Sequence, residues 1–215
     1  HNNFHTVAGR YAPFAKLMRN DGLRVSASTG KFSPATFKDV DVLVISDPLA
    51  PGMGAAGATA ATATSAAAFT DAECDAVRDW VRGGGSLLLI ADHAPFGSAA
   101  ETLARRFGVE FGMGFVLDSA HHLPGRGITM LVFAGDQLGD HAITRGRDAA
   151  DQIRTVVSFT GQSMSIPAGA TALLRLSTVI FCRGWSCECR WCCSRAGPGR
   201  RSLAAPYYAA TACAA

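Results

Sequence analysis

The chain has 215 residues, a formal net charge of +3 at pH 7 and 48% hydrophobic residues, which is enough for one sizeable core. No run of basic residues occurs before the C-terminal tail, so nothing suggests a nucleic-acid partner. No apolar stretch approaches the roughly 18 residues of a membrane span. The chain starts at His1 without a signal peptide, so a cytoplasmic and an exported protein both stay open.

The first part of the chain alternates helical and strand patterns. Apolar residues at helical spacing between Tyr11 and Met18 predict a helix, and LRVSAS at 23–28 predicts a strand. Ser33 followed by proline is typical of a helix N-cap and predicts a short helical turn. VDVLVIS at 40–46 is nearly all apolar, which predicts a strand covered on both faces.

The same alternation continues after a low-complexity stretch. Residues 50–68 are rich in Ala and Gly and predict a long loop. Thr70 and Glu73 form a capping-box pattern that opens a helix, which ends at three glycines before the strand SLLLIA. Ser98 and Glu101 repeat the capping-box pattern and predict a second helix start.

Further strands are expected in the second half of the chain. They are predicted at 109–117, 128–134, 153–159 and 170–176. The alternation of strands and helices up to about residue 110 predicts an α/β fold with a mainly parallel sheet and helices on both faces. The strand-rich remainder predicts an antiparallel edge or extension of that sheet.

Four blocks of the sequence carry a family resemblance. They are HNNFHTVAGRYAPFAKLMRNDGLRV, DVLVIS, FTDAECDAVRDWVRGGGSLLLIADHAPFGSAAETLARRFGVEF and HAITRG, spread over roughly residues 1–176. Together they resemble the class I glutamine amidotransferase-like superfamily, and more closely its ThuA-like and uncharacterised bacterial branches. The resemblance implies a flavodoxin-like fold. It also implies that the first strand is missing from this chain, because His1–His5 match the loop that follows that strand.

The resemblance further implies a site at the turn after SLLLIA. True amidotransferases hold a nucleophilic Cys at this turn, whereas this chain has Asp92 and His93. Glutamine hydrolysis through a thioester is therefore not expected. Cys74 belongs to the preceding predicted helix and does not replace the missing nucleophile.

The composition changes at about residue 178. Residues 178–215 are dense in Cys, Arg and Trp and show neither a strand period nor a helical period. We therefore divide the chain into an α/β domain at 1–177 and an atypical tail at 178–215, whose composition is typical of translation in a shifted frame. A metal knuckle around Cys187–Cys193 and a set of disulfides are the alternatives.

The pair Asp92 and His93 is the leading candidate for chemistry. Ligands of open parallel sheets bind at the carboxyl ends of strands, where this pair, the first loop and Asp118 are expected to meet. An Asp next to a His at such an end suits the His for general-base catalysis. The structural alternative is that Asp92 caps the following turn while His93 packs on its neighbours.

Two further kinds of site have weaker support. Ser98 is the candidate nucleophile, although a capping role explains this serine better, and no GxSxG motif occurs. A metal site has suitable ligand types but no supporting spacing, so neither a metal nor a cofactor is expected. Its ligands would come from His5, Asp92, His93, Asp118 and His121.

These patterns predict a hydrolase of the esterase kind that acts on an ester or related acyl bond of a small substrate. The expected catalytic residues are Asp92, His93 and Ser98, with an activated water as the other possible nucleophile. The expected substrate-binding residues are Asn3, His5, Arg10, Tyr11 and Asp118. The alternative is a non-catalytic, ThuA-like binding module for a carbohydrate or cell-envelope ligand.

Overall fold

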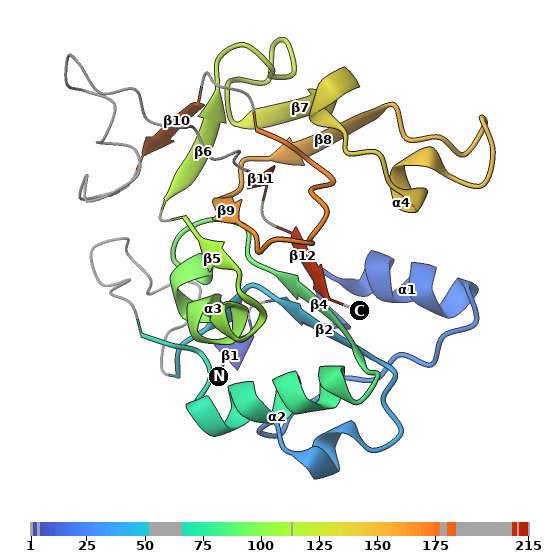
Figure 1. Ribbon diagram of the computed structural model, residues 1–215, viewed down its shortest axis with the longest axis vertical. Helices are drawn as coiled ribbons and strands as arrows, with labels where there is room; N and C mark the ends of the chain where they lie inside the picture. Colours follow the sequence, from blue (N-terminus) through green and yellow to red (C-terminus); the bar gives the residue numbers. More distant parts are fainter. Residues whose placement is uncertain are drawn as a thin grey trace.

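The structure of the chain is a computed structural model. It describes residues 2–3, 5–51, 66–112, 114–176, 180–183, 208–209 and 211–214. Most of the loop expected at 50–68, and most of the atypical tail, lie outside the described residues. Figure 1 shows helices α2 (Asp71–Arg82) and α3 (Phe96–Ala104) beside a small sheet in the lower part, and mainly strands in the upper part.

The central sheet contains the one parallel strand pair among the described strands. β2 (Val42–Ser46) runs parallel to β4 (Ser86–Ile90), and both strands lie where the sequence predicts them. β12 (Thr211–Ala214) pairs with β4 in the antiparallel direction. Because Ser46 lies opposite Ile90, the carboxyl ends of β2 and β4 are neighbours, and this edge of the sheet positions the site.

The chain reaches this sheet through a short strand and a helix. β1 (Asn2–Asn3) pairs antiparallel with β3 (Pro48–Leu49), which follows β2. α1 (Ala12–Asn20) confirms the helix predicted from the apolar spacing, and it has a proline in its first turn, where a missing N–H costs nothing. The chain leaves the helix at Gly22, which adopts the left-handed φ of 89° that ends many helices.

Helices cover one face of the sheet and build the first core. α2 begins at its predicted cap: Glu73 N–H donates to Thr70 Oγ1 at 3.3 Å, and Thr70 N–H donates to the Glu73 carboxylate at 3.0 Å. The 3-10 helix η1 (Pro34–Phe37) likewise starts at Ser33 with a capping box, as predicted. Buried side chains of η1, α2, α3, β2 and β4 form one continuous cluster that includes Val77 and Leu89.

The start of β2 is accessible to solvent, which corrects the expectation that this strand is covered on both faces. Val42 and Val44 point away from the first core and are 50% and 38% exposed. Within the described residues, β2 pairs only with β4, so β2 forms the edge of this sheet. The apolar run therefore predicted the strand correctly, but the coverage of both faces that it also predicted is absent at this edge strand.

The second part of the chain is built from short strands and short helices. In chain order they are η2 (Arg105–Phe107), β5 (Glu110–Phe111), β6 (Phe115–Asp118), β7 (Met130–Ala134), η3 (Gly135–Gln137), α4 (Ala142–Arg145), β8 (Thr155–Phe159) and β9 (Ser163–Ser165). β7 pairs with β8, and β5 pairs with β9, both antiparallel. Two strands of the tail also pair antiparallel: β10 (Ile180–Arg183) with β6 and β11 (Tyr208–Ala209) with β9.

The sheet arrangement corrects the prediction of a mainly parallel sheet. Every described strand pair except β2–β4 is antiparallel. Antiparallel strands do follow in the second part, but among the described residues β5–β9 and β7–β8 belong to sheets separate from that of β2 and β4 and do not extend it. Residues 23–28 form no strand, and at 170–176 Leu174 makes only an isolated bridge to Leu138.

A second, smaller core supports the strand-rich part. It is formed by Val116, Leu131 and Phe133, with Leu138, Val156, Leu174 and Leu176 packed against it. The segment that carries the last two leucines is held by a backbone hydrogen bond of 2.8 Å from Gly139 N–H to the Leu173 carbonyl. The two cores are separate clusters among the described residues.

Replacing Gly139 with alanine is expected to lower the free energy of unfolding by about 1–3 kcal/mol. A Cβ at this position would collide with the carbonyl oxygen of Ala172, which is backbone and has little freedom to move away. Gly30→Ala is the matched control, because a Cβ there would meet nothing within 4 Å. Urea unfolding of both variants measures the difference, and equal midpoints would contradict the close packing of this segment.

The start of α3 corrects the second predicted capping box. The helix begins at Phe96 with Pro95 at its N-cap, so Ser98 is the third helical residue and does not cap the helix. The Ala99 N–H already donates to the Pro95 carbonyl at 3.1 Å. The expected partner, Glu101, instead accepts hydrogen bonds from Phe111 N–H at 3.0 Å and from Arg105 Nε at 2.8 Å. Proline and the buried Phe96 thus fix an earlier start than the capping pattern indicates.

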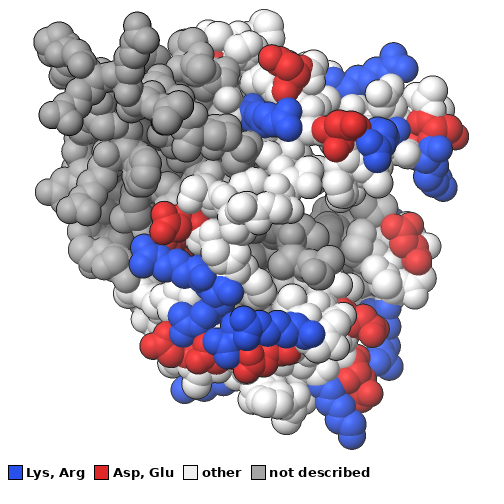
Figure 2. All heavy atoms as spheres, in the orientation of Figure 1, with Lys and Arg blue, Asp and Glu red and all other residues white. Residues whose placement is uncertain are grey.

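Charged residues are intermixed on the surface around α2. Figure 2 shows basic and acidic side chains next to one another over the lower part of the molecule. Arg106 illustrates this, since it contacts Asp71 at 2.6 Å and Asp75 at 2.8 Å. Among the described residues, no helix is long and apolar enough to cross a membrane.

Candidate functional site

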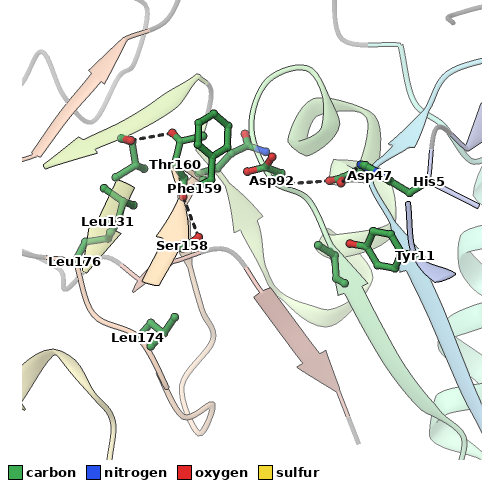
Figure 3. A pocket seen from close by; sticks show the side chains of 14 residues that line it. His5, Tyr11, Asp47, Asp92, Leu131, Ser158, Phe159, Thr160, Leu174 and Leu176 are labelled. Atoms are coloured by element: carbon green, nitrogen blue, oxygen red, sulfur yellow. Dashed lines mark hydrogen bonds and ion pairs between the residues drawn. The ribbon is translucent and has the colours of Figure 1, made fainter. Parts of the chain in front are cut away.

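A cavity of about 340 Å³ opens at the carboxyl ends of β2 and β4 (Figure 3). Three residues singled out in the sequence line it: His5, Tyr11 and Asp92. The cavity also holds Asp47 and a wall from the second part of the chain. That wall consists of Val116, Leu131, Ser158, Phe159, Thr160, Gly161, Gln162, Leu174 and Leu176, and Ile90 completes the lining.

Asp47 is the buried centre of the polar side of the cavity. Its side chain is 5% exposed, and it follows directly after β2. One carboxylate oxygen accepts a hydrogen bond from the Asp92 N–H at 2.9 Å, and the other lies 3.0 Å from Nε2 of His5. Asp47 therefore ties the first loop to the turn after β4.

Asp92 presents the second carboxyl group and is the more accessible of the two. Its side chain is 33% exposed and lines the cavity. Burial raises the pKa of Asp92 above its usual value, and the nearby Asp47 charge adds to this rise, while His93 and His5 oppose it. Burial also raises the pKa of Asp47, against the lowering effect of the Asp92 N–H and His5. Two interacting carboxyl groups of this kind lose their protons in two linked steps.

His5 lies in the first loop, and Tyr11 is the N-cap residue of α1. The ring centroids of His5 and Tyr11 are 5.1 Å apart, and Figure 3 shows the Tyr11 hydroxyl directed toward the middle of the cavity. Burial raises the pKa of Tyr11, Ser46 opposes this rise, and the Asp47 and Asp92 charges add smaller upward contributions. Tyr11 therefore keeps its proton at neutral pH and can donate a hydrogen bond into the cavity.

His93 lies behind Asp92 and does not line the cavity. Its Nδ1 is 3.5 Å from Oδ2 of Asp92, and its side chain is 24% exposed. Its ring packs edge-on against Phe115 at a centroid distance of 4.5 Å and also contacts Phe96 at 5.5 Å. Asp92 and His93 thus lie next to each other, but only Asp92 of the two lines the cavity.

Gln162 occupies the N-terminus of α3, where an oxyanion could otherwise bind. With its amide oriented to match its neighbours, its oxygen accepts from the Gly97 N–H at 2.8 Å and its nitrogen donates to the Gly112 carbonyl at 2.5 Å. Ser98 sits on this helix and is not a lining residue of the cavity. Gln162 therefore connects the start of α3 to the second part of the chain through hydrogen bonds.

The other predicted binding residues lie apart from the cavity lining. Asn3 pairs through its backbone with Pro48, and Arg10 is exposed next to α1. Asp118 is buried at the end of β6, where one carboxylate oxygen accepts from the N–H groups of Ala120 and His121 at 2.8 and 2.9 Å. Its other oxygen lies 3.2 Å from Nδ1 of His121. Asp118 therefore organises its own turn.

The ligand set of a metal site is not assembled in the described part of the chain. No group of three His, Cys, Asp or Glu side chains is close enough there to hold a metal ion. Cys74 is buried in α2, and burial raises the pKa of its thiol to about 11. It therefore stays protonated at neutral pH and is unsuited to act as a nucleophile.

Sequence reasoning missed Asp47 and the segment from Thr160 to Gln162. Asp47 could have been found, because it follows a predicted strand parallel to the one that ends before Asp92. Thr160 has a left-handed φ of 41°, and its hydroxyl donates to the Val116 carbonyl at 2.9 Å. This contact joins residues 44 positions apart, so no local pattern indicates it.

The comparisons with known proteins show a likeness of fold to a solved structure. No protein-family model matches the chain, and no curated protein matches its sequence. The solved structure of the mmIFT52 N-terminal domain is similar, with a TM-score of 0.63 and 17% sequence identity over 84% of this chain and 71% of that chain. An identity this low shows the fold alone. The chain thus has a mixed α/β fold of the kind found in the mmIFT52 N-terminal domain.

Proposed function

We propose that the chain is a hydrolase that cleaves an ester or related acyl bond of a small substrate in the cavity at the carboxyl ends of β2 and β4. The observation that carries the proposal is the pair of neighbouring carboxyl groups with raised pKa values, one buried and one facing the cavity. Clusters of perturbed carboxyl groups in a cleft are typical of acid–base sites.

Asp92 is the general base in this proposal. Its carboxylate takes a proton from a water molecule, whose oxygen attacks the acyl carbon of the ester. The carbonyl oxygen gains negative charge, which a hydrogen bond from the Tyr11 hydroxyl stabilises. When the bond to the alcohol breaks, the proton on Asp92 passes to the alcohol oxygen, and an acid and an alcohol leave.

The remaining polar residues hold Asp92 in place. Asp47 fixes the turn through the Asp92 N–H, and His5 contacts Asp47 from the first loop. His93 acts on Asp92 as a positioning residue, since it borders the carboxyl group without lining the cavity. We also propose that the fold belongs with the ThuA-like and bacterial branches of the class I amidotransferase-like superfamily, with Asp92 and His93 at the turn where the amidotransferases carry a Cys.

The second candidate function is a binding module without catalysis. Tyr11 and Phe159 place two aromatic rings beside two carboxyl groups, and Phe159 is 56% exposed. Aromatic rings next to hydrogen-bonding carboxylates suit the alternating apolar and hydroxyl surfaces of a carbohydrate. Binding of a sugar without turnover of any ester would favour this function.

The pH profile of ester hydrolysis tests the role of Asp92. The rate of p-nitrophenyl butyrate hydrolysis should rise with pH through the pKa of Asp92, because only its carboxylate acts as a base. Asp47→Asn removes a negative charge that raises this pKa, so the acidic limb of log(kcat/KM) should move to lower pH. The asparagine oxygen can still accept from the Asp92 N–H.

The control for this experiment is Asp136→Asn, an exposed aspartate outside the cavity lining. Its pH profile should overlay that of the wild type. An acidic limb that stays in place in Asp47→Asn would contradict the coupling of the two carboxyl groups. The absence of wild-type turnover with every short-chain ester would overturn the hydrolase.

A further inference from the structure

The cavity has two chemically different ends. Figure 3 shows Tyr11, His5 and Asp47 on one side and Leu131, Leu174 and Leu176 on the other, with Asp92 between them. Ser158 and Thr160 also lie on the leucine side, where their hydroxyls donate to the Thr160 and Val116 carbonyls. A molecule that fills this space would therefore place a polar group at the first end and an apolar group at the second. The reacting atom would lie near the middle, beside Asp92.

The apolar end is a permanent part of the fold. Leu131 and Val116 are only 2% and 1% exposed, and both belong to the second core. Leu174 and Leu176 pack on that core from a segment that is tied down by the hydrogen bond from Arg175 N–H to the Gln137 carbonyl, at 2.8 Å. A fixed apolar wall favours ligands by the area of hydrocarbon that it removes from water.

The charges of the lining limit what the polar end accepts. Among the described residues, the cavity lining holds two aspartates and no lysine or arginine. A ligand that carries its own carboxylate or phosphate would therefore meet like charge without a permanent cation to offset it. The small volume, about 340 Å³, lies at the lower end of the range for small-molecule sites.

We infer that the substrate class is an uncharged ester with a linear aliphatic acyl chain, whose chain lies against Leu131, Leu174 and Leu176 and whose alcohol part faces His5 and Tyr11. This inference rests on the proposed hydrolase for the reaction. The preference for an uncharged molecule with an aliphatic tail follows from the cavity itself, so it can be measured without turnover.

Binding of unreactive amides provides that measurement. Calorimetry with butanamide, hexanamide and octanamide should show an affinity that rises about fourfold for each added methylene, the factor expected for burying one CH2 group. The anion octanoate at pH 7 should bind at least about tenfold more weakly than octanamide. Equal affinities across the amide series, or for octanoate and octanamide, would overturn the inference.

Substitutions in the apolar wall test where the aliphatic chain of the ligand lies. Leu174→Ala and Leu176→Ala should each weaken octanamide binding several-fold more than butanamide binding, because the longer tail reaches further along the wall. Leu17→Ala is the matched control, since this leucine is 54% exposed on α1 and lies outside the cavity lining. An unchanged dependence on chain length in both wall variants, with far-ultraviolet circular dichroism like the wild type, would overturn the placement of the tail.

Ester kinetics distinguish a failure of this inference from a failure of the proposed function. In a series of p-nitrophenyl esters, kcat/KM should rise from acetate to hexanoate in the same proportion as amide affinity. A chain-length dependence in amide binding without any ester turnover would support the binding preference and overturn the hydrolase. Ester turnover with no dependence on chain length would support the hydrolase and overturn the substrate class.

Discussion

Asp92→Asn is expected to lower kcat/KM for short-chain esters by about 10²–10⁴-fold, the contribution typical of a positioned general base. The asparagine keeps the size of the side chain and the N–H that donates to Asp47 at 2.9 Å, so the turn after β4 should keep its shape. It lacks only the ability to take a proton from water. The change should therefore appear in kcat, with KM altered little.

The control variants decide whether the base is Asp92 or His93. Asp136→Asn should retain wild-type activity, and the thermal midpoint of Asp92→Asn should stay within a few degrees of wild type. His93→Ala should cost less activity than Asp92→Asn, because His93 does not line the cavity. A loss in His93→Ala as large as in Asp92→Asn, together with loss of the acidic limb, would make His93 the base.

The acidic limb of the pH profile of log(kcat/KM) provides a separate test of the role of His93. His93 lowers the pKa of Asp92, so its removal should move the limb to higher pH. Asp47→Asn should move the limb in the opposite direction. Opposite shifts in the two variants would be hard to obtain from a general loosening of the fold, which would move both profiles alike.

Phe133→Ala should have the largest effect on stability, a loss of about 3–5 kcal/mol in the free energy of unfolding. Phe133 is 2% exposed at the centre of the small second core, where few other side chains can fill the space left behind. Since Leu131 and Leu174 pack in the same core, the apolar wall of the cavity should be lost as well. Urea unfolding measures the first effect, and octanamide binding measures the second.

Phe133→Leu should recover most of the loss, since it restores most of the apolar volume. Leu23→Ala, at an exposed leucine after α1, should change the stability by less than about 0.5 kcal/mol. A Phe133→Ala variant that unfolds like the wild type would show that the second core contributes little to stability. The cavity wall would then need another support.

Local patterns predicted those elements whose signals lie within a few residues. Thr70 with Glu73, and Ser33 before Pro34, mark helix starts that the structure confirms. The apolar runs at 42–46 and 86–90 form strands for the same reason. The pattern at Ser98 failed because Pro95 and the buried Phe96 start the helix earlier.

The sequence patterns did not indicate which strands pair or which distant residues meet at the cavity. Residues 23–28 carry a strand pattern but have no partner among the described strands, and propensity alone does not provide one. For the site, two neighbouring parallel strands could predict where Asp92 lies. The other wall of the cavity comes from Thr160 and Leu174, which reach it through antiparallel pairing and long-range backbone contacts.

Asp47 also has a backbone φ of 47°, in the left-handed region that most residues avoid and that aspartate, asparagine and glycine tolerate best. The contact with the Asp92 N–H requires, in addition, an acceptor oxygen on the side chain at this position. A mutational survey scored on protein abundance should therefore accept asparagine at position 47, which meets both demands, and reject valine and isoleucine, which meet neither. Few side chains combine a tolerance of this backbone with an acceptor oxygen at this length, so position 47 should be among the least variable positions at the carboxyl ends of β2 and β4.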